Sequence, residues 1–283
     1  MKKFTFLLII MLFFAAVCNV FGQAKTYPFE VKKTGKGKQS LIFIPGFASS
    51  GDVWNETIAK FEKDFSCYTL TMAGFAGTKP GTDPNFKDWE KGIADYIQDN
   101  NIEKPIIIGH SMGGGFALAI AADYPQLVGK IVIVDTLPCL AALSDPNFIS
   151  KENMDCSAMI NTFTAMSDEQ FKQMQDQSIP RLLADTSMQS TVIDWSMKSD
   201  RKTFAKMYCD FSNTDLREKI KNIQCPSLIL LESYFAFMKP SIEAQYKNLK
   251  NANLQYSTKG LHFIMYDDKE WYFNQLNNFL SVK

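Results

Sequence analysis

The sequence predicts an α/β fold, a mostly parallel sheet with helices on both faces and a helical insertion late in the chain. Short apolar runs typical of buried strands alternate with amphipathic segments over residues 39–135 and again over 216–280. Between residues 137 and 214 this alternation is lost, and methionines and aromatic residues become frequent. The chain is long enough for one such domain that carries an insertion.

The first residues indicate an export signal. Met1–Lys3 is basic, and the apolar stretch Phe4–Val17 is too short to span a bilayer comfortably. Residues 20–22 then offer small or modest side chains where a signal peptidase reads. We predict a bacterial-type signal peptide over residues 1–22, an exported protein that is periplasmic or secreted, and no stable membrane span after cleavage. A retained amphipathic anchor is the alternative.

The charge balance indicates neither a nucleic acid nor an anionic membrane surface as a partner. The full chain has 30 basic and 30 acidic residues. Removal of residues 1–22 takes away Lys2 and Lys3 and no acids, which leaves 28 against 30. A balance so close to neutral does not attract a polyanion. The oligomeric state is not predicted.

Cysteine usage says little about the function. The sequence has six cysteines, and one of them, Cys18, lies in the predicted leader. The five that remain cannot all pair within the chain, and no C-x-x-C motif is present. Cys67 and Cys225 lie at predicted strand starts and are expected to be buried free thiols. Cys139 and Cys156 are candidates for a bridge after export.

The elements around the centre of the chain follow from hydrophobic periodicity. The first two strands are expected to pair with each other, and the second, nearly all apolar, is expected to be central. A capping box at Ser167–Gln170 predicts the start of a helix in the insertion. The expected strands are 28–33, 39–45, 67–72, 105–108, 130–135, 226–232 and 254–257, and the expected helices outside the insertion are 54–61, 86–97, 116–122, 216–223, 242–249 and 272–280.

The motif G-x-S-x-G at residues 109–113 lies between an apolar strand and a buried helix. In this context it predicts a nucleophile elbow, a turn so tight that Ser111 projects from its apex in a strained conformation. Gly109 and Gly113 are needed because a Cβ at either position would collide with the neighbouring strand or helix. The helix that follows aims its N–H groups at any developing oxyanion.

With this motif, the sequence resembles the α/β-hydrolase fold family from Leu41 to the C-terminus, less closely between about 137 and 214. The resemblance implies a mostly parallel sheet flanked by helices, with a helical cap inserted after the sixth strand. It divides the chain into a core of residues 23–136 and 215–283 and a cap of residues 137–214. The form Gly109–Gly114 is the one seen in esterases and lipases of that family.

The general base is expected to be His262. The sequence has two histidines, and His110, inside the elbow, is expected to point away from the nucleophile. His262 follows the last strand in Gly260–Phe263, where the resemblance places the base. A serine hydroxyl attacks at neutral pH only when an imidazole accepts its proton. With both histidines accounted for and no Cys/His cluster, no metal and no cofactor are expected.

The acid is where the sequence departs from the family. The resemblance implies an aspartate a few residues beyond the seventh strand, but Phe235 stands at that place. Asp135 ends the strand beside the elbow strand, at the edge where sites of open α/β sheets gather. Some members, haloalkane dehalogenases among them, take their acid from that strand end. We therefore predict Asp135 as the acid, with Glu232 as the alternative.

The oxyanion hole is predicted from two backbone N–H groups, those of Phe47 and Met112. Residues 44–47 end a strand where the family has His-Gly, and Pro45 replaces that histidine. The predicted function is a serine hydrolase of carboxylic esters that works through an acyl-enzyme. Amide, thioester or C–C bond hydrolysis and a non-catalytic ligand-binding protein are the alternatives. The methionines and aromatic residues of the cap favour a small apolar substrate over a charged one.

Overall fold

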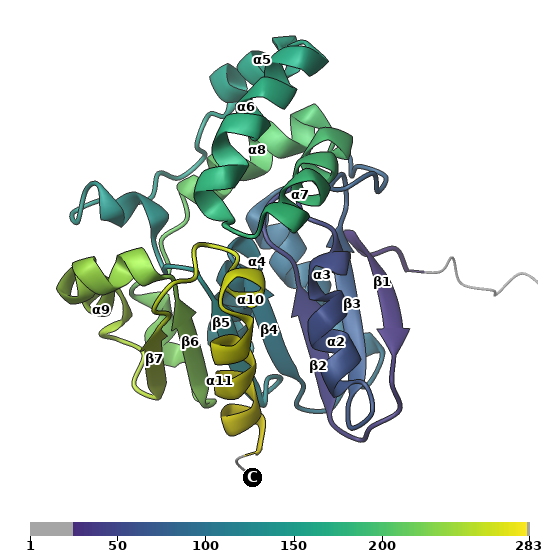
Figure 1. The fold of residues 1–283 in the computed structure, drawn as a ribbon, viewed down its shortest axis with the longest axis vertical. Coiled ribbons are helices and arrows are strands. Elements are labelled where there is room, and N and C mark those ends of the chain that lie inside the picture. The colour runs from purple at the N-terminus through teal and green to yellow at the C-terminus, as the bar shows by residue number, and fades with distance from the viewer. Residues whose placement is uncertain (1–24, 282–283) are drawn as a thin grey trace, which may run out of the picture.

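The structure is a computed structural model and describes residues 25–281, so the predicted signal peptide and Cys18 lie outside the described residues. Among these residues, seven strands form one sheet in the order β1-β3-β2-β4-β5-β6-β7 (Figure 1). All neighbouring pairs are parallel except β1–β3. The predicted mostly parallel sheet is confirmed. The strands are β1 (Phe29–Thr34), β2 (Ser40–Ile44), β3 (Ser66–Met72), β4 (Ile106–His110), β5 (Lys130–Val134), β6 (Ser227–Leu231) and β7 (Ala252–Tyr256).

The predicted pairing of the first two strands is wrong. β1 pairs with β3 in antiparallel register, for example Val31 opposite Leu70, and β2 lies between β3 and β4. The burial of the two strands explains this order. All five residues of β2 are buried, as the centre of a covered sheet requires, whereas β1 exposes most of its residues. A charged strand of that kind is suited to the edge of a sheet.

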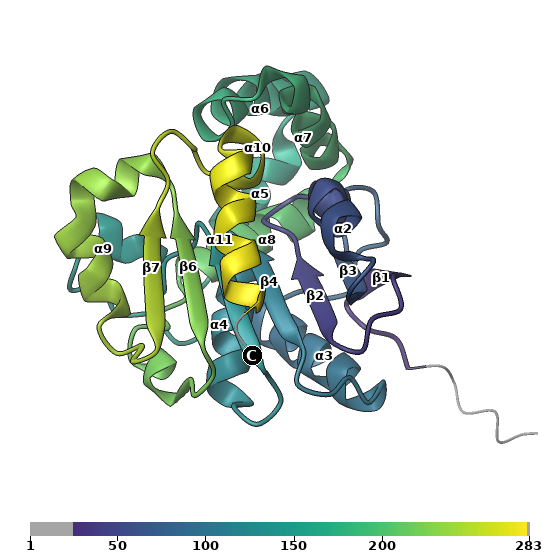
Figure 2. The ribbon, with the colours of Figure 1, turned by 60° about the horizontal axis from the view of Figure 1, so that its bottom comes forward.

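Helices cover both faces of the sheet. The core cluster on one face takes in α3 (Phe86–Asp99), α4 (Met112–Asp123) and α9 (Lys239–Tyr246). On the other face, α2 (Asn55–Phe61), the short α10 (Ile264–Asp267) and α11 (Lys269–Ser281) pack against the strands. Figure 2 shows α11 crossing in front of the middle of the sheet. The helix predicted at 216–223 is only a short 3-10 turn, η3 (Lys219–Asn222).

The insertion between β5 and β6 is helical and lies over the carboxyl ends of the parallel strands (Figure 1). The insertion follows β5, the fifth strand of the chain, and not the sixth as predicted. The count is lower by one because one strand, β1, comes before β2 in the described chain. The capping box is confirmed, since Ser167 and Gln170 exchange hydrogen bonds at the start of α6. The boundaries at 137 and 214 stay predictions. The helices of the insertion are α5 (Ser157–Ala165), α6 (Asp168–Leu182), α7 (Thr186–Lys198) and α8 (Arg201–Ser212).

The described cysteines form one disulfide, between Cys156 and Cys209. It joins the residue before α5 to the last turn of α8. The candidate bridge between Cys139 and Cys156 is not formed, and Cys139 is a buried free thiol. Cys67 and Cys225 are buried free thiols, as predicted.

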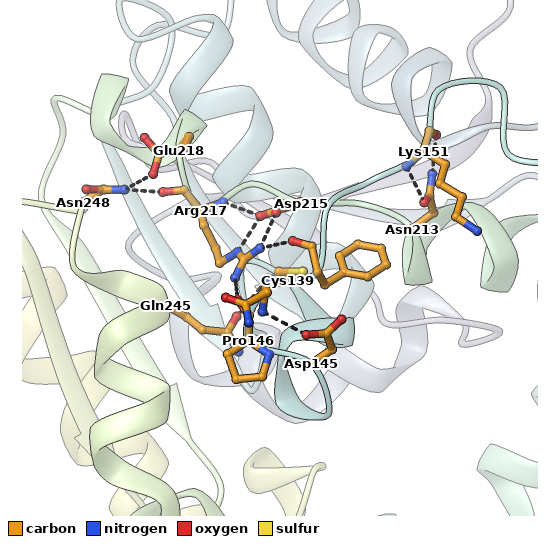
Figure 3. A network of polar contacts seen from close by, with 12 residues as sticks. Cys139, Asp145, Pro146, Lys151, Asn213, Asp215, Arg217, Glu218, Gln245 and Asn248 are labelled. Carbon is orange, nitrogen blue, oxygen red and sulfur yellow. Dashed lines mark hydrogen bonds and ion pairs between the residues drawn. The ribbon is translucent and has the colours of Figure 1, made fainter.

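A polar network holds the two ends of the insertion against the core (Figure 3). The Arg217 guanidinium donates to Asp215 and to the carbonyls of Pro146 and Phe148. A second link is reciprocal, since the Lys151 N–H donates to the Asn213 side chain, whose amide donates back to the Lys151 carbonyl, each at 2.9 Å. The loop from β5 to α5 is thus fixed to the segment that leaves α8. Within residues 25–281, no helix combines the length and the apolar character needed to cross a membrane.

Candidate active site

The predicted elbow is present between β4 and α4. Ser111 has φ 52° and ψ −123°, a backbone conformation that L-residues rarely adopt and that marks stored strain. The flanking glycines are required by contact distance. A Cβ on Gly109 would lie 2.2 Å from the Gly113 carbonyl oxygen, and one on Gly113 would lie 2.3 Å from that of Ile44. The turn therefore fixes Ser111 at the carboxyl end of the sheet.

Thr136 secures this turn, and sequence reasoning missed it. Its hydroxyl donates to the Ser111 carbonyl at 2.5 Å, and the Tyr246 hydroxyl donates to the carbonyl of Thr136 itself. A Cβ on Gly114 would lie 2.1 Å from the Thr136 hydroxyl, so glycine at 114 is what lets Thr136 approach. Gly114, the second glycine after the serine, was the available signal for a close contact here.

Asp135 and His262 are brought together, although 127 residues separate them. Asp135 Oδ2 lies 2.6 Å from His262 Nδ1, and its Oδ1 accepts the Glu232 N–H at 2.7 Å. The backbone N–H of Asp135 donates to the Leu230 carbonyl, and the residue has φ 51°. Both oxygens of this buried carboxylate therefore have donors, as a buried charge requires.

Glu232, the alternative acid, lies beside this pair. The contact it makes with Asp135 is through its backbone, and its carboxyl makes no hydrogen bond to His262 or to another described residue. Burial, and then the charge of Asp135, raises the pKa of Glu232 to about 7, while His262 opposes the rise. The geometry favours Asp135 as the partner of His262.

His262 is set up to act through its other nitrogen. Because Nδ1 donates to Asp135, Nε2 is the nitrogen left to accept a proton. Burial lowers the pKa of His262, but the hydrogen bond and charge of Asp135, joined by the charge of Glu232, raise it above its ordinary value overall. A histidine with a raised pKa is a stronger base and still exchanges a proton near neutral pH.

His110 was predicted to point away from the nucleophile. In addition, its ring makes a contact that the prediction did not include. Its ring is buried, and Nε2 lies 3.0 Å from the backbone carbonyl of His262. A carbonyl only accepts, so Nε2 carries the hydrogen. Burial, and then the charge of His262, lowers the pKa of His110 well below its ordinary value, which keeps this ring neutral. His110 therefore ties the backbone of the histidine loop to the end of β4.

The predicted oxyanion donors, Phe47 and Met112, lie on the two segments that meet at the elbow. Gly46 packs against the elbow so closely that a Cβ there would lie 2.8 Å from His110 Nδ1 and 3.2 Å from Ser111 Cβ. Phe47 follows it in a turn, and Met112 opens α4. In the described chain, neither N–H donates a hydrogen bond to another protein group. Two free donors beside one serine are the arrangement that an oxyanion hole needs.

A cavity of about 560 Å³ is lined by Phe47, His110, Ser111, Asp135, Glu232 and His262. Its floor is the sheet edge with Ser111, Asp135 and His262, and its roof is formed by the helices of the insertion. The lining residues are mostly apolar and include no lysine or arginine. Those of the insertion helices are Phe163, Met174, Gln175, Ser178, Ile179, Leu182, Val192, Ser196, Phe204, Tyr208 and Phe211. Among residues 25–281, no group of three or more His, Cys, Asp or Glu side chains could hold a metal ion.

Comparison with known proteins decides the family, because a profile described as alpha/beta hydrolase fold matches residues 39–269. The chain belongs to the alpha/beta hydrolase fold family. The prediction of an enzyme of this fold is thereby confirmed at the level of the family. The roles of the individual site residues stay predictions.

Three similar proteins illustrate the range within this family. A pimeloyl-[acyl-carrier protein] methyl ester esterase of Wigglesworthia glossinidia brevipalpis is 23% identical over 80% of this chain and 86% of its own length. An N-formylmaleamate deformylase of Pseudomonas putida is 21% identical over 87% of this chain and 90% of its own. The crystal structure of an enol-lactonase from Burkholderia xenovorans has a TM-score of 0.74 at 14% identity and covers 89% of this chain and 96% of that one.

Proposed function

We propose that this protein is a serine hydrolase that cleaves carboxylic esters through an acyl-enzyme, with Ser111, His262 and Asp135 as its triad. The observation that carries the proposal is the 2.6 Å contact between His262 Nδ1 and Asp135 Oδ2, in the same cavity as a strained, projecting Ser111. A serine, an imidazole and a carboxylate in this order are the parts needed to activate a hydroxyl at neutral pH.

The reaction runs in two halves. Ser111 Oγ attacks the ester carbonyl while His262 Nε2 takes its proton, and the N–H groups of Phe47 and Met112 stabilise the oxyanion. The C–O bond of the leaving alcohol then breaks, and the alcohol receives the proton from His262. A water molecule repeats the sequence on the acyl-enzyme and releases the acid. Asp135 holds the tautomer of His262 and stabilises its charged form throughout.

The choice of an ester rests on the cavity and on the relatives. An apolar cavity with no cation suits an uncharged acyl or alcohol group. Two of the similar proteins are named for ester bonds, as a methyl ester esterase and an enol-lactonase, whereas a third is a deformylase. Amide, thioester and C–C bond cleavage would use the same residues and remain the alternatives.

We also propose that the insertion acts as a cap over this site and that the protein is exported. Residues of α5 to α8 line the cavity opposite Ser111, which supports the cap. The disulfide between Cys156 and Cys209 supports export, because disulfides persist in oxidising compartments such as the periplasm.

The test of the proposed function is the loss of activity in Ser111→Ala and His262→Ala. Each should lower the turnover of p-nitrophenyl esters by about 10⁶, because triad members act as a unit. A fluorophosphonate probe should label the wild type and not Ser111→Ala. Ser241→Ala, at an exposed position of α9, is the matched control and should behave as the wild type.

Two results would contradict the proposal. Appreciable ester turnover by Ser111→Ala would exclude this serine as the nucleophile. A folded wild type that neither reacts with the probe nor turns over any ester would favour the non-catalytic ligand-binding protein.

A further inference from the structure

Two polar side chains interrupt the apolar stripes with which α6 and α7 face the cavity. The buried residues of α6 are Phe171, Gln175 and Ile179, spaced four apart along one face of the helix. On α7, Ser196 lies four residues after Val192, again in the buried stripe. Both Gln175 and Ser196 line the cavity, and the two helices pack on each other.

Neither side chain has a partner within the described protein. Gln175 is 5% exposed and Ser196 is 4% exposed, yet the amide of one and the hydroxyl of the other make no hydrogen bond to any described residue. Neither group is sealed from the cavity, unlike the unpartnered atoms buried elsewhere in the fold. An amide that opens only to the cavity must find its hydrogen-bond partners there, whereas an apolar residue of similar size would need none.

The remaining polar groups around the cavity limit what can bind at this place. Ser49 and Thr136 already donate to backbone carbonyls, and Asp135 is bound to His262. Ser178 and Tyr208 also line the cavity, but both are exposed. No lysine or arginine lines the cavity, whereas Asp135 and Glu232 do, so a carboxylate or phosphate would meet repulsion and no counter-charge. An amide and a hydroxyl each offer a donor and an acceptor, which suits an uncharged polar group.

We propose that Gln175 and Ser196 form a polar subsite that binds a neutral hydrogen-bonding group, such as a ketone, amide or hydroxyl, at the distal part of an otherwise apolar ester. This inference rests on the proposed function and deepens it, because it names the class of substrate. The ester carbonyl lies at Ser111 on the floor, and the apolar chain crosses the cavity to the roof. The amide of Gln175 and the hydroxyl of Ser196 then gain the hydrogen-bond partners that the protein itself does not supply.

The experiment compares matched esters that differ only in a distal carbonyl. The p-nitrophenyl esters of 4-oxopentanoic, 5-oxohexanoic and 6-oxoheptanoic acids are each assayed against the unsubstituted ester of the same length. We expect at least one keto ester to exceed its partner by about tenfold in kcat/KM, the effect of one hydrogen bond to a buried group. Gln175→Leu should abolish this preference, and Ser196→Ala should reduce it.

The controls separate a ligand subsite from a packing role. Gln177→Leu makes the same change on the exposed side of α6 and should leave the preference intact. Gln175→Met, with an unbranched chain, replaces Gln175→Leu if that variant fails to fold. A packing role would lower the melting temperature of the Gln175 variants and leave the keto-to-alkyl ratio unchanged, and that outcome overturns the proposal.

Binding to Ser111→Ala separates this inference from the proposed function. Calorimetry on that variant should show tighter binding of the preferred keto ester than of its alkyl partner, and Gln175→Leu in the same background should remove the difference. If the wild type proves inactive, this binding difference still supports the subsite. Equal binding of each pair overturns it, even in an active enzyme.

Discussion

On the floor of the cavity, each oxygen of the buried carboxylate of Asp135 has a hydrogen-bond donor, at 2.6 and 2.7 Å. In the roof, the buried amide of Gln175 and the hydroxyl of Ser196 have no partner in the described protein. The two regions face each other across one cavity, so they share the same solvent and the same ligand. They differ in whether their polar groups are satisfied before a ligand arrives.

This difference separates two tasks. Groups that stabilise a transition state must be held in place beforehand, because reorganising them during the reaction would raise the barrier. The floor meets this requirement, since its residues follow β4, β5 and β7 of a rigid sheet. Groups that recognise a substrate must be free to bind it and to release it. The free polar groups of the roof fit that second task.

The largest expected effect is the loss of activity when Asp135, on the floor of the cavity, is replaced. Asp135→Asn should lower kcat by about 10⁴, because the amide no longer holds the imidazole in the tautomer that accepts the serine proton. Steady-state kinetics on the best p-nitrophenyl ester measures this. Thermal unfolding followed by circular dichroism should show that the variant is folded.

The opposite pattern of activity in two variants would assign the role of the acid to Glu232, which follows β6. If Glu232→Gln lost the activity and Asp135→Asn kept it, the acid would be Glu232, and the contact between Asp135 and His262 would be structural.

In the roof, the largest effect is expected from the disulfide, since it is a covalent link between the start of α5 and the end of α8. The bridge closes a loop with a sequence separation of 53 residues. For a loop of this length, the chain-entropy model gives a loss of about 4 kcal/mol in the free energy of unfolding for Cys156→Ser. Chemical denaturation of the wild type and the variant, each with and without reductant, measures it.

Reductant supplies the control for this prediction. It should destabilise the wild type to the level of Cys156→Ser and leave the variant unchanged, because the other described cysteines are free thiols. A wild type whose unfolding midpoint does not respond to reductant would contradict the prediction.

The floor was largely predictable from the sequence, because its residues lie next to strong local signals. The apolar runs fixed the central strands, the G-x-S-x-G motif marked the elbow, and Asp135 and His262 each follow a strand. What the sequence did not predict are contacts between distant segments. His110 with the carbonyl of His262, and Thr136 with the carbonyl of Ser111, depend on how three segments meet in space.

The roof was predictable as a class of structure and not in detail. A local signal, the capping box of Ser167 and Gln170, placed the start of α6 correctly. Of the methionines that suggested a substrate pocket, only Met174 is among the lining residues of the described cavity. Helical periodicity gives the buried face of a helix, but not whether that face meets a neighbouring helix or a cavity. The pairing of Cys156 with Cys209 is equally a matter of packing.

A smaller effect is expected from the support of the elbow. Thr136→Val removes the hydroxyl that donates to the Ser111 carbonyl, which keeps the N–H groups of Gly114 and Gly115 as donors. The loss should therefore stay near the net value of one hydrogen bond, about 1 kcal/mol in the free energy of unfolding. Urea denaturation measures it. Thr136→Ser keeps the hydroxyl and should recover most of the stability, and equal losses in both variants would show that the methyl group matters instead.

The smallest effect expected on the floor is a shift in pH dependence caused by Glu232. The carboxylate charge of Glu232 raises the pKa of His262, and the base must be neutral to accept the serine proton. Removing that charge in Glu232→Gln lowers the pKa of His262, so the acid limb of kcat/KM should move to lower pH.

The pKa of Glu232 is itself raised to about 7, so this residue is already partly neutral where His262 titrates. The shift should for that reason be small, with most activity kept at the plateau. Glu243→Gln, at an exposed position of α9, is the matched control and should leave the profile unchanged. A shift to higher pH would mean that Glu232 lowers the pKa of His262, and it would contradict the prediction.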